Sequence, residues 1–154
     1  MDPHTITTEA KMLLDMMGIH SKELSVSIDN DLQLTILSLR VSGTEQELFI
    51  QNFNELKRDF GLLFKELLKK KHHYYKDIII DINGQDKKFI NQTKEKASIA
   101  VERVQFFDKP YEFGYLNAYE RMLIHTYLKN TPEIITESTG EGKDRRLNIK
   151  KKAS

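Results

Sequence analysis

The sequence predicts an α+β protein made of two small domains. Segments with helical periodicity alternate with segments of strand periodicity along all 154 residues. The net charge also changes sign near Gly84. Residues 1–84 carry 10 Lys and Arg against 13 Asp and Glu, whereas residues 85–154 carry 14 Lys and Arg against 10 Asp and Glu. A chain of this length accommodates one medium domain or two small ones. We therefore place a first domain at residues 7–83 and a second at residues 84–152.

The first half alternates between helical and strand patterns. Thr7 or Thr8 is a candidate N-cap for its first helix, and Gly18 stands where that helix should end. A second long helical pattern is interrupted near residues 52–54. The predicted elements are a helix over 7–17, with Met12, Leu13, Met16 and Met17 as its apolar stripe, strands over 23–28 and 32–41, helical spacing over 45–71 and a strand over 74–82.

The second half predicts a three-stranded sheet with two helices packed against it. Pro110 ends the first helix, and the loop over residues 139–144 contains two glycines that suit a tight connection. The predicted elements are a helix over 86–107, a short strand over 111–113, a helix over 117–129 and strands over 133–138 and 145–150.

The helix over residues 117–129 carries the most informative residues. Arg121 and His125 are four residues apart, which places them on one helical face together with Lys129. The opposite face is apolar, through Leu116, Tyr119, Leu123 and Tyr127. A guanidinium group can bind phosphate with two hydrogen bonds, and both planar groups can stack on a base. The alternative is a solvated helix face without a ligand.

Further basic residues follow the glycine loop. Lys143, Arg145 and Arg146 are candidates for electrostatic contacts with a nucleic-acid backbone. Successive residues of a strand point to opposite faces, so only one of the two arginines can share a face with Arg121 and His125. A second basic region, residues 57–76, holds seven basic and two acidic side chains. Solubilising lysines on an exposed helix would explain that region equally well.

Several ordered motifs carry a resemblance to a known family. Glu120-Arg-Met-Leu-Ile-His125 is followed by Thr136-Glu-Ser-Thr-Gly-Glu-Gly142 and by Lys143-Asp-Arg-Arg-Leu-Asn-Ile149, and it is preceded by Asp81-Ile-Asn-Gly84. This set resembles the R-three-H domain, named for its Arg-x-x-x-His signature. It is similar in particular to the bacterial Jag family, in which a KH domain precedes an R-three-H domain. That family usually has proline where Ala118 stands, and Asn117 remains able to cap the helix.

The resemblance implies a type II KH-like fold, αββααβ, for the first half. The predicted order of a helix, two strands, two helices and a strand agrees with it. In a functional KH domain a Gly-x-x-Gly loop contacts the nucleic-acid backbone. The corresponding residues here are Gln51-Asn-Phe-Asn54, without glycine, so we expect a degenerate KH domain. We expect no counterpart of the small amino-terminal domain that Jag-like proteins often carry.

Other classes of function find little support. The chain has no cysteine, and its first residues lack the pattern of a secretory signal or membrane anchor, so we expect a cytoplasmic protein. His72 and His73 are adjacent, which does not suit a metal site. No phosphate-binding P-loop and no Gly-x-Ser-x-Gly nucleophile turn is present. We therefore expect no enzyme, no metal, no cofactor and no small-molecule substrate.

The predicted function is non-enzymatic binding of single-stranded nucleic acid, RNA or DNA with RNA favoured, mainly through the second domain. Arg121 would contact phosphate or a base edge, and His125 would stack or donate a hydrogen bond beside it. Lys129, Lys143, Arg145 and Arg146 would supply backbone electrostatics. The alternative is a protein-interaction adaptor that uses the degenerate KH domain to bind a partner, such as another KH protein, and has little affinity for RNA.

Overall fold

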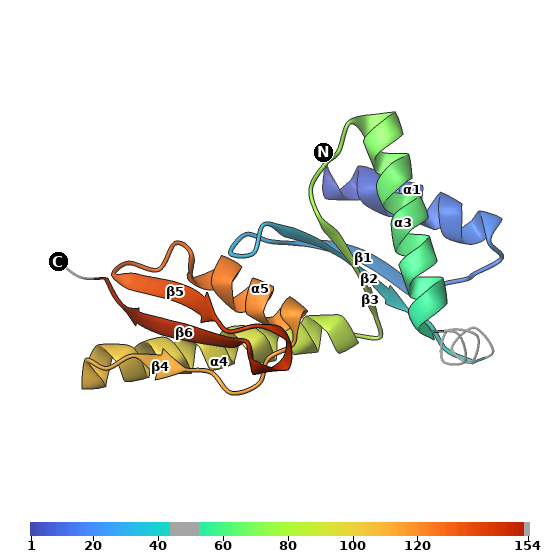
Figure 1. Cartoon of the computed structure of the whole chain (residues 1–154). Coiled ribbons are helices and arrows are strands. Elements are labelled where there is room, and N and C mark those ends of the chain that lie inside the picture. The colour runs from blue at the N-terminus through green and yellow to red at the C-terminus, as the bar shows by residue number, and fades with distance from the viewer. Residues whose placement is uncertain (44–52, 153–154) are drawn as a thin grey trace. The chain divides into compact units, whose positions relative to one another are not determined.

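The chain divides into two compact units, Met1–Lys88 and Phe89–Ser154 (Figure 1). The structure, a computed structural model, describes residues 1–43 and 53–152. Each unit contains a three-stranded sheet and a hydrophobic core of its own. The predicted α+β class is therefore confirmed. No helix within the described ranges is long and apolar enough to span a bilayer.

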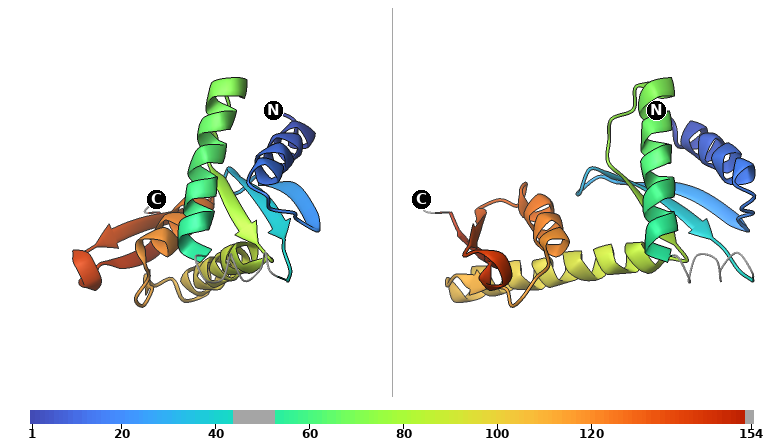
Figure 2. Two further views of the ribbon diagram at one scale, coloured as in Figure 1. Left: turned by 90° about the vertical axis from the view of Figure 1, so that its right-hand side faces the viewer. Right: turned by 45° about the vertical axis from the view of Figure 1, so that its right-hand side comes forward.

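In the part of the first unit that the structure describes, two helices pack on one face of a mixed sheet (Figure 2). The strand order is β1-β2-β3, with β1 antiparallel to β2 and β2 parallel to β3. Alternate residues of β2 and β3 point into the core between the sheet and the helices. The described elements are α1 (Pro3–Met16), β1 (Glu23–Asp29), β2 (Leu34–Arg40), α3 (Phe53–His72) and β3 (Ile78–Ile82).

Helix α1 begins four residues before its predicted start and ends at Met16, one residue before its predicted end. Pro3 occupies the first helical turn, where its fixed φ suits the helix and its missing N–H costs nothing. Thr7 and Thr8 therefore do not cap the helix, and their hydroxyls donate to the carbonyls of Pro3 and His4. At the other end Gly18 has φ +71°, and the amide of the next residue closes the helix with a hydrogen bond to the carbonyl of Leu14.

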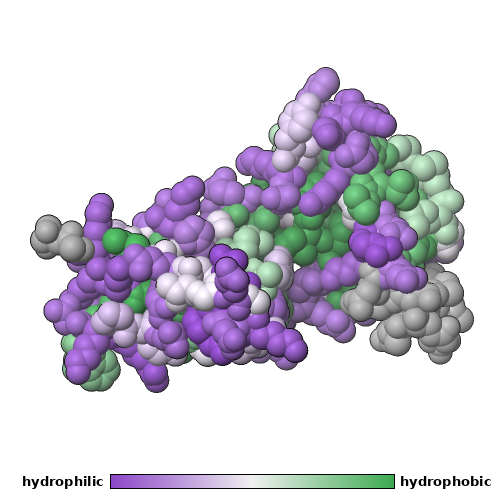
Figure 3. Space-filling model, in the orientation of Figure 1, coloured by the Kyte–Doolittle hydropathy of each residue, from purple (hydrophilic) through white to green (hydrophobic). Residues whose placement is uncertain are grey.

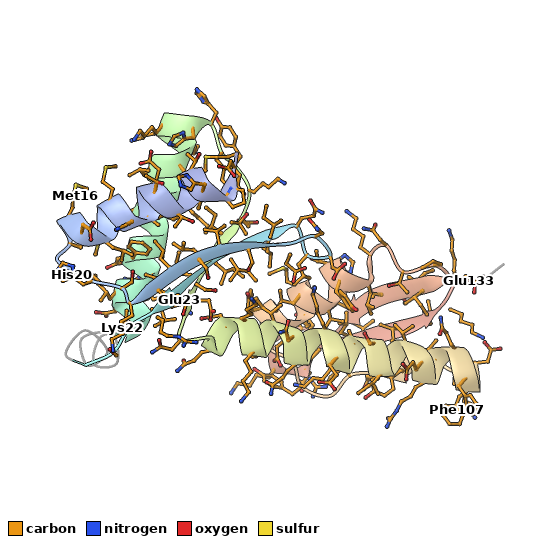
Figure 4. The ribbon with its side chains drawn as sticks, turned by 180° about the vertical axis from the view of Figure 1, so that it is seen from behind. Met16, His20, Lys22, Glu23, Phe107 and Glu133 are labelled. Atoms are coloured by element: carbon orange, nitrogen blue, oxygen red, sulfur yellow. The ribbon has the colours of Figure 1, made fainter. Side chains whose placement is uncertain are left out.

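The predicted methionine stripe of α1 is wrong. Met12 is 44% exposed and Met16 is 70% exposed; Met16 is labelled in Figure 4 near the C-terminal end of the helix. The buried face is rotated away from the methionines. It consists of Ile6, Glu9, Ala10, Leu13 and Leu14. Of the predicted residues only Leu13 lies in the core.

Helix α3 supplies the aromatic centre of the first core. Phe60 and Phe64 are almost fully buried and their rings stack with centroids 5.7 Å apart. Leu68 continues the buried row one turn further on. The predicted helix over residues 45–51 lies outside the described residues, as do Gln51 and Asn52 of the predicted degenerate loop, and α3 begins directly after them at Phe53.

A charged cluster joins α1 to the end of α3. Glu9 is buried, and its Oε1 atom lies 2.6 Å from Lys71 Nζ and 2.8 Å from His72 Nε2. Hydrogen bonds from Lys71 and then His72 lower the pKa of Glu9 below its ordinary value of 4.5, although burial opposes this shift. The folded protein therefore holds this proton less tightly than the unfolded chain does.

This cluster predicts an acid-dependent loss of stability. A carboxyl group with a lowered pKa stabilises the fold above its unfolded pKa, and this contribution disappears as the pH falls through the folded pKa. Glu9→Gln should therefore reduce the stability difference between about pH 6 and about pH 3, measured as urea unfolding midpoints. Glu66→Gln, which removes an exposed carboxylate 3.9 Å from Lys69, is the control and should leave that difference unchanged. Equal pH profiles for wild type and Glu9→Gln would contradict the assignment.

Helix α4 starts at the end of the first unit. Asp81 is 1% exposed, and its Oδ1 atom accepts hydrogen bonds from the backbone amides of Asp86 (2.9 Å) and Lys87 (3.3 Å) in the first turn of α4. A carboxylate at this position satisfies free amides and interacts favourably with the helix dipole. Ser38 donates to the second carboxylate oxygen at 3.0 Å. The Asp81-Ile-Asn-Gly84 motif thus fixes the beginning of α4.

In the second unit α4 and α5 pack with a small antiparallel sheet of order β4-β6-β5. This agrees with the predicted three strands and two helices. The last strand reaches Lys151, one residue beyond the predicted end. The elements are α4 (Gln85–Phe107), β4 (Tyr111–Glu112), α5 (Ala118–Leu128), β5 (Ile134–Thr139), the short 3-10 helix η1 (Gly142–Asp144) and β6 (Arg146–Lys151).

Candidate nucleic-acid interface

Helix α5 begins with a complete capping box. Asn117 Oδ1 accepts from the amide of Glu120 at 2.9 Å, and Glu120 Oε2 accepts from the amide of Asn117 at 3.0 Å. The reciprocal pair satisfies two amides that the first turn leaves free. The prediction that Asn117 caps this helix is confirmed. The capping box fixes the start of the helix that carries Arg121 and His125.

The apolar face of α5 differs in part from the predicted stripe. Leu116 and Leu123 are buried as predicted, but Tyr119 is 37% exposed and stacks on Phe89 with ring centroids 6.0 Å apart. The buried residues within the helix are Leu123, Ile124 and Leu128. Tyr127 is half-buried, and its hydroxyl lies 3.2 Å from that of Ser98.

Strands β5 and β6 present a matching row of side chains. Thr136 pairs with Ile149 and Ser138 pairs with Leu147, so these four residues share one face of the sheet. Leu147 and Ile149 are buried in the second core. Thr136 and Ser138 therefore lie on the same face as that core, and both contribute to one pocket with α5.

Two of the predicted site residues are held by these strand hydroxyls. His125 Nδ1 and Thr136 Oγ1 are 2.5 Å apart and share a hydrogen bond, and Arg145 Nε donates to Ser138 Oγ at 2.9 Å. The bond on Nδ1 fixes the imidazole ring and leaves Nε2 on its other side. Arg145 uses one of its five donors and keeps its terminal N–H groups.

Arg121 is anchored differently and is half-buried rather than fully solvent-facing. Its Nη1 atom donates to the carbonyl of Leu116 at 2.6 Å, immediately before the helix. This bond holds the side chain against the start of α5. A guanidinium group has four further donors for a ligand, and its position is already fixed before a ligand binds.

These side chains surround a pocket of about 390 Å³. The volume falls within the range of about 300–1,000 Å³ that is usual for ligand sites. Ala118 and Met122 from α5 and Leu147 from β6 form the apolar part of its lining. The complete lining is Ala118, Arg121, Met122, His125, Thr136, Ser138, Arg145 and Leu147. Two guanidinium groups thus face an apolar surface, and the described lining contains no carboxylate.

The other predicted site residues do not line this pocket. Arg146 Nη1 donates to the carbonyls of Lys143 (2.7 Å) and Arg145 (3.2 Å), so Arg146 organises the loop before β6. Lys143 is exposed in η1, and Lys129 is exposed at the C-cap of α5. The structure therefore brings together three of the six candidates, Arg121, His125 and Arg145.

Several residues that line the pocket have no role that the sequence alone indicates. Thr136 and Ser138 belong to the motif over residues 136–142. Only the structure shows that their hydroxyl groups anchor His125 and Arg145. Their i, i+2 spacing is an available signal, because such residues share one face of a strand. The positions of Met122 and Leu147 in the lining depend on how α5 packs on the sheet.

The second unit is thus a small α+β domain whose pocket combines two guanidinium groups and an imidazole ring with an apolar lining. Residues 89–151 match the family model of the R-three-H domain, so the chain contains an R-three-H domain, a class of domain that generally binds single-stranded nucleic acid. Comparison with curated proteins gave no match.

Proposed function

We propose that the protein binds single-stranded RNA through the pocket between α5, β5 and β6, without chemical change to the strand. The observation that carries the proposal is the convergence of Arg121, His125 and Arg145, from two different segments, on one apolar surface. Each of the three is already anchored by a hydrogen bond to the protein. Little side-chain freedom is then lost on binding.

The chemistry of the pocket suits a nucleotide. The terminal N–H groups of two guanidinium groups can bind phosphate oxygens in pairs. The side chains of Met122 and Leu147 offer an apolar surface for a base, and the His125 ring can stack or donate from Nε2. RNA is the proposed strand because its 2′-hydroxyl can donate to or accept from the hydroxyls of Thr136 and Ser138.

A fluorescence-anisotropy titration tests the proposal. Labelled single-stranded RNA, single-stranded DNA and duplex RNA of the same sequence would be titrated at several salt concentrations. We expect the affinity to fall as the salt concentration rises. We also expect it to be highest for single-stranded RNA, lower for single-stranded DNA and lowest for duplex RNA. A gel of the RNA after incubation tests the absence of chemistry, since a nuclease would shorten the strand with time. Absence of RNA binding at low salt would refute the proposed function.

Two neighbouring arginines provide a matched pair for this assay. Arg145 lines the pocket, whereas Arg146 bonds to loop carbonyls. Arg145→Ala should weaken RNA binding by about 1–3 kcal/mol, as expected for an arginine that contacts the ligand. Arg146→Ala removes the same charge and should have the smaller effect. If both variants were folded and lost affinity equally, the contact of Arg145 in the pocket would not account for the binding.

For the first unit we propose the KH-like fold. Its described elements follow the order helix, two strands, a helix after the undescribed residues 44–52, and a strand, which supports the proposal. The second candidate function, a protein-interaction adaptor, is favoured by exposed apolar residues on the described helices of this unit, Met12 and Met16 on α1 and Leu62 and Leu63 on α3. Such an adaptor would bind a protein partner in a salt-resistant way and bind RNA weakly.

A further inference from the structure

We infer that the end of α3 and the loop after it form a second contact for the single strand, separate from the pocket of the R-three-H domain. The contact consists of Lys69, Lys70, Tyr75 and Lys76, and we call it the α3-end surface. It lies within the first unit. The inference rests on the proposed function for the identity of the ligand, but no residue of the pocket takes part in it.

Positive charge exceeds negative charge at this end of the helix. Lys69, Lys70 and Lys76 are exposed, and Lys69 lies 3.9 Å from Glu66, a long ion pair. Within the described ranges no carboxylate lies within ion-pair distance of Lys70 or Lys76. Figure 3 shows hydrophilic side chains gathered over the C-terminal end of α3, at the top of the view. Exposed lysines of this kind attract phosphate and release its counterions.

The helix dipole explains only part of this arrangement. Lysines in the last turn of a helix interact favourably with its negative end, which accounts for Lys69 and Lys70. The helix ends at His72, and His73 leaves it with φ +52°. Lys76 lies beyond the helix and gains nothing from the dipole. The stabilisation of the helix therefore does not explain why the positive charge continues to Lys76.

Two consecutive tyrosines after α3 differ in their burial. Tyr74 packs against the first core, and its hydroxyl lies 2.5 Å from that of Thr35. Tyr75 is 70% exposed, one of the most exposed large side chains in the described chain. The anchored Tyr74 fixes the loop, and the exposed Tyr75 lies between it and the exposed Lys76 in the chain. An exposed ring within a basic surface is the arrangement on which single-stranded bases stack.

The α3-end surface is distinct from the loop that a KH domain uses. In the KH-like fold proposed for the first unit, that loop corresponds in sequence to residues 51–54, whereas Lys69 and Lys70 lie in the last turn of α3. Sixteen residues separate Phe53 from Lys69, which is about 24 Å along a helix. Because the same chain carries an R-three-H domain, a strand held by one unit is presented to the other at high effective concentration. A weak contact here would therefore raise the overall affinity.

The test compares two triple variants of equal charge. Lys69→Gln/Lys70→Gln/Lys76→Gln removes the α3-end surface, and Lys22→Gln/Lys87→Gln/Lys88→Gln removes three lysines elsewhere in the first unit. Both would be titrated as full chains with a long single-stranded RNA at several salt concentrations, after circular dichroism has established that they are folded. The first variant should flatten the slope of log affinity against log salt by about 2, since each lost phosphate contact contributes about 0.7. The control should change it by less than about half as much.

Tyr75 provides an independent measurement. Tyr75→Ala should weaken RNA binding about fivefold or more, the lower range of base–aromatic stacking, whereas Tyr75→Phe should retain it. If wild type binds RNA and both triple variants behave alike, the inference fails while the proposed function stands. If wild type does not bind RNA at all, both fail. Lysine-dependent binding to phosphatidylserine vesicles, with RNA binding unchanged, would identify a lipid surface and overturn the inference.

Discussion

The double variant Arg121→Ala/His125→Ala should lose about 2–5 kcal/mol of binding free energy for single-stranded RNA, or roughly 30-fold to several thousand-fold in affinity. An arginine that recognises a base or phosphate contributes about 1–3 kcal/mol, and a stacking group contributes a similar amount. The two side chains lie in one pocket, so their effects need not add. Neither belongs to the hydrophobic core, and the variant should remain folded.

The control for this variant removes the same two residue types from the first unit. His20→Ala/Arg40→Ala deletes side chains that are 76% and 72% exposed and that lie in long ion pairs, 4.0 Å from Asp15 and 3.6 Å from Glu23. We expect its RNA affinity to remain within about threefold of wild type, because neither side chain lines the pocket and exposed charges are largely screened at physiological salt. An equal loss in both variants, or a folded double variant that binds like wild type, would show that the pocket is not the binding site.

The second large effect concerns stability. Phe64→Ala should lower the free energy of unfolding of the first unit by about 3–5 kcal/mol, the usual cost of truncating a buried phenylalanine. Phe64 is fully buried and stacks on Phe60, so the truncation leaves a cavity and removes a ring contact. Urea unfolding followed by circular dichroism measures the change.

The adjacent residue supplies the control for this measurement. Leu63 is 57% exposed on the same helix, and Leu63→Ala should change the stability by no more than about 0.5 kcal/mol. The pocket of the R-three-H domain is lined entirely by residues of the second unit, so folded Phe64→Ala protein should keep the contribution of Arg121 and His125 to RNA binding. A loss below about 1 kcal/mol would mean that the core repacks around the missing ring.

Local signals in the sequence determine most of the elements but not their exact faces. Strand alternation and the capping residue Asn117 correctly locate the second sheet and the start of α5. The methionines of α1 are predicted inside because hydrophobicity alone does not show which side of a helix meets the sheet. Ile6 and Ala10 form that side instead. Tertiary packing overrides a periodicity that fits two helical faces almost equally well.

The candidate site is predictable only in part, for a related reason. Arg121 and His125 lie four residues apart in the same helix, so helical geometry alone places them on one face. The alternation of the last strand places Arg145, rather than Arg146, on the face of the buried Leu147. Which residues of β5 meet Arg145 depends on the register of β5 with β6, and no local pattern specifies that register. The anchoring hydroxyls of Thr136 and Ser138 come from the same pairing. Contacts between segments that are far apart in the chain can be identified only from the structure.

The capping box of α5 also determines which charges a ligand meets. Glu120 precedes Arg121 in the chain, yet its carboxylate is turned to the amide of Asn117 and lies 3.7 Å from Lys96. In the proposed function, this engagement keeps the acidic residue next to Arg121 in the chain from competing with phosphate for the guanidinium group. If the first turn of α5 opened, Glu120 would be released to neutralise Arg121. Fraying at this helix end and affinity for anions are therefore thermodynamically linked, and a bound strand should in turn protect the amides of Asn117 and Glu120 from hydrogen exchange.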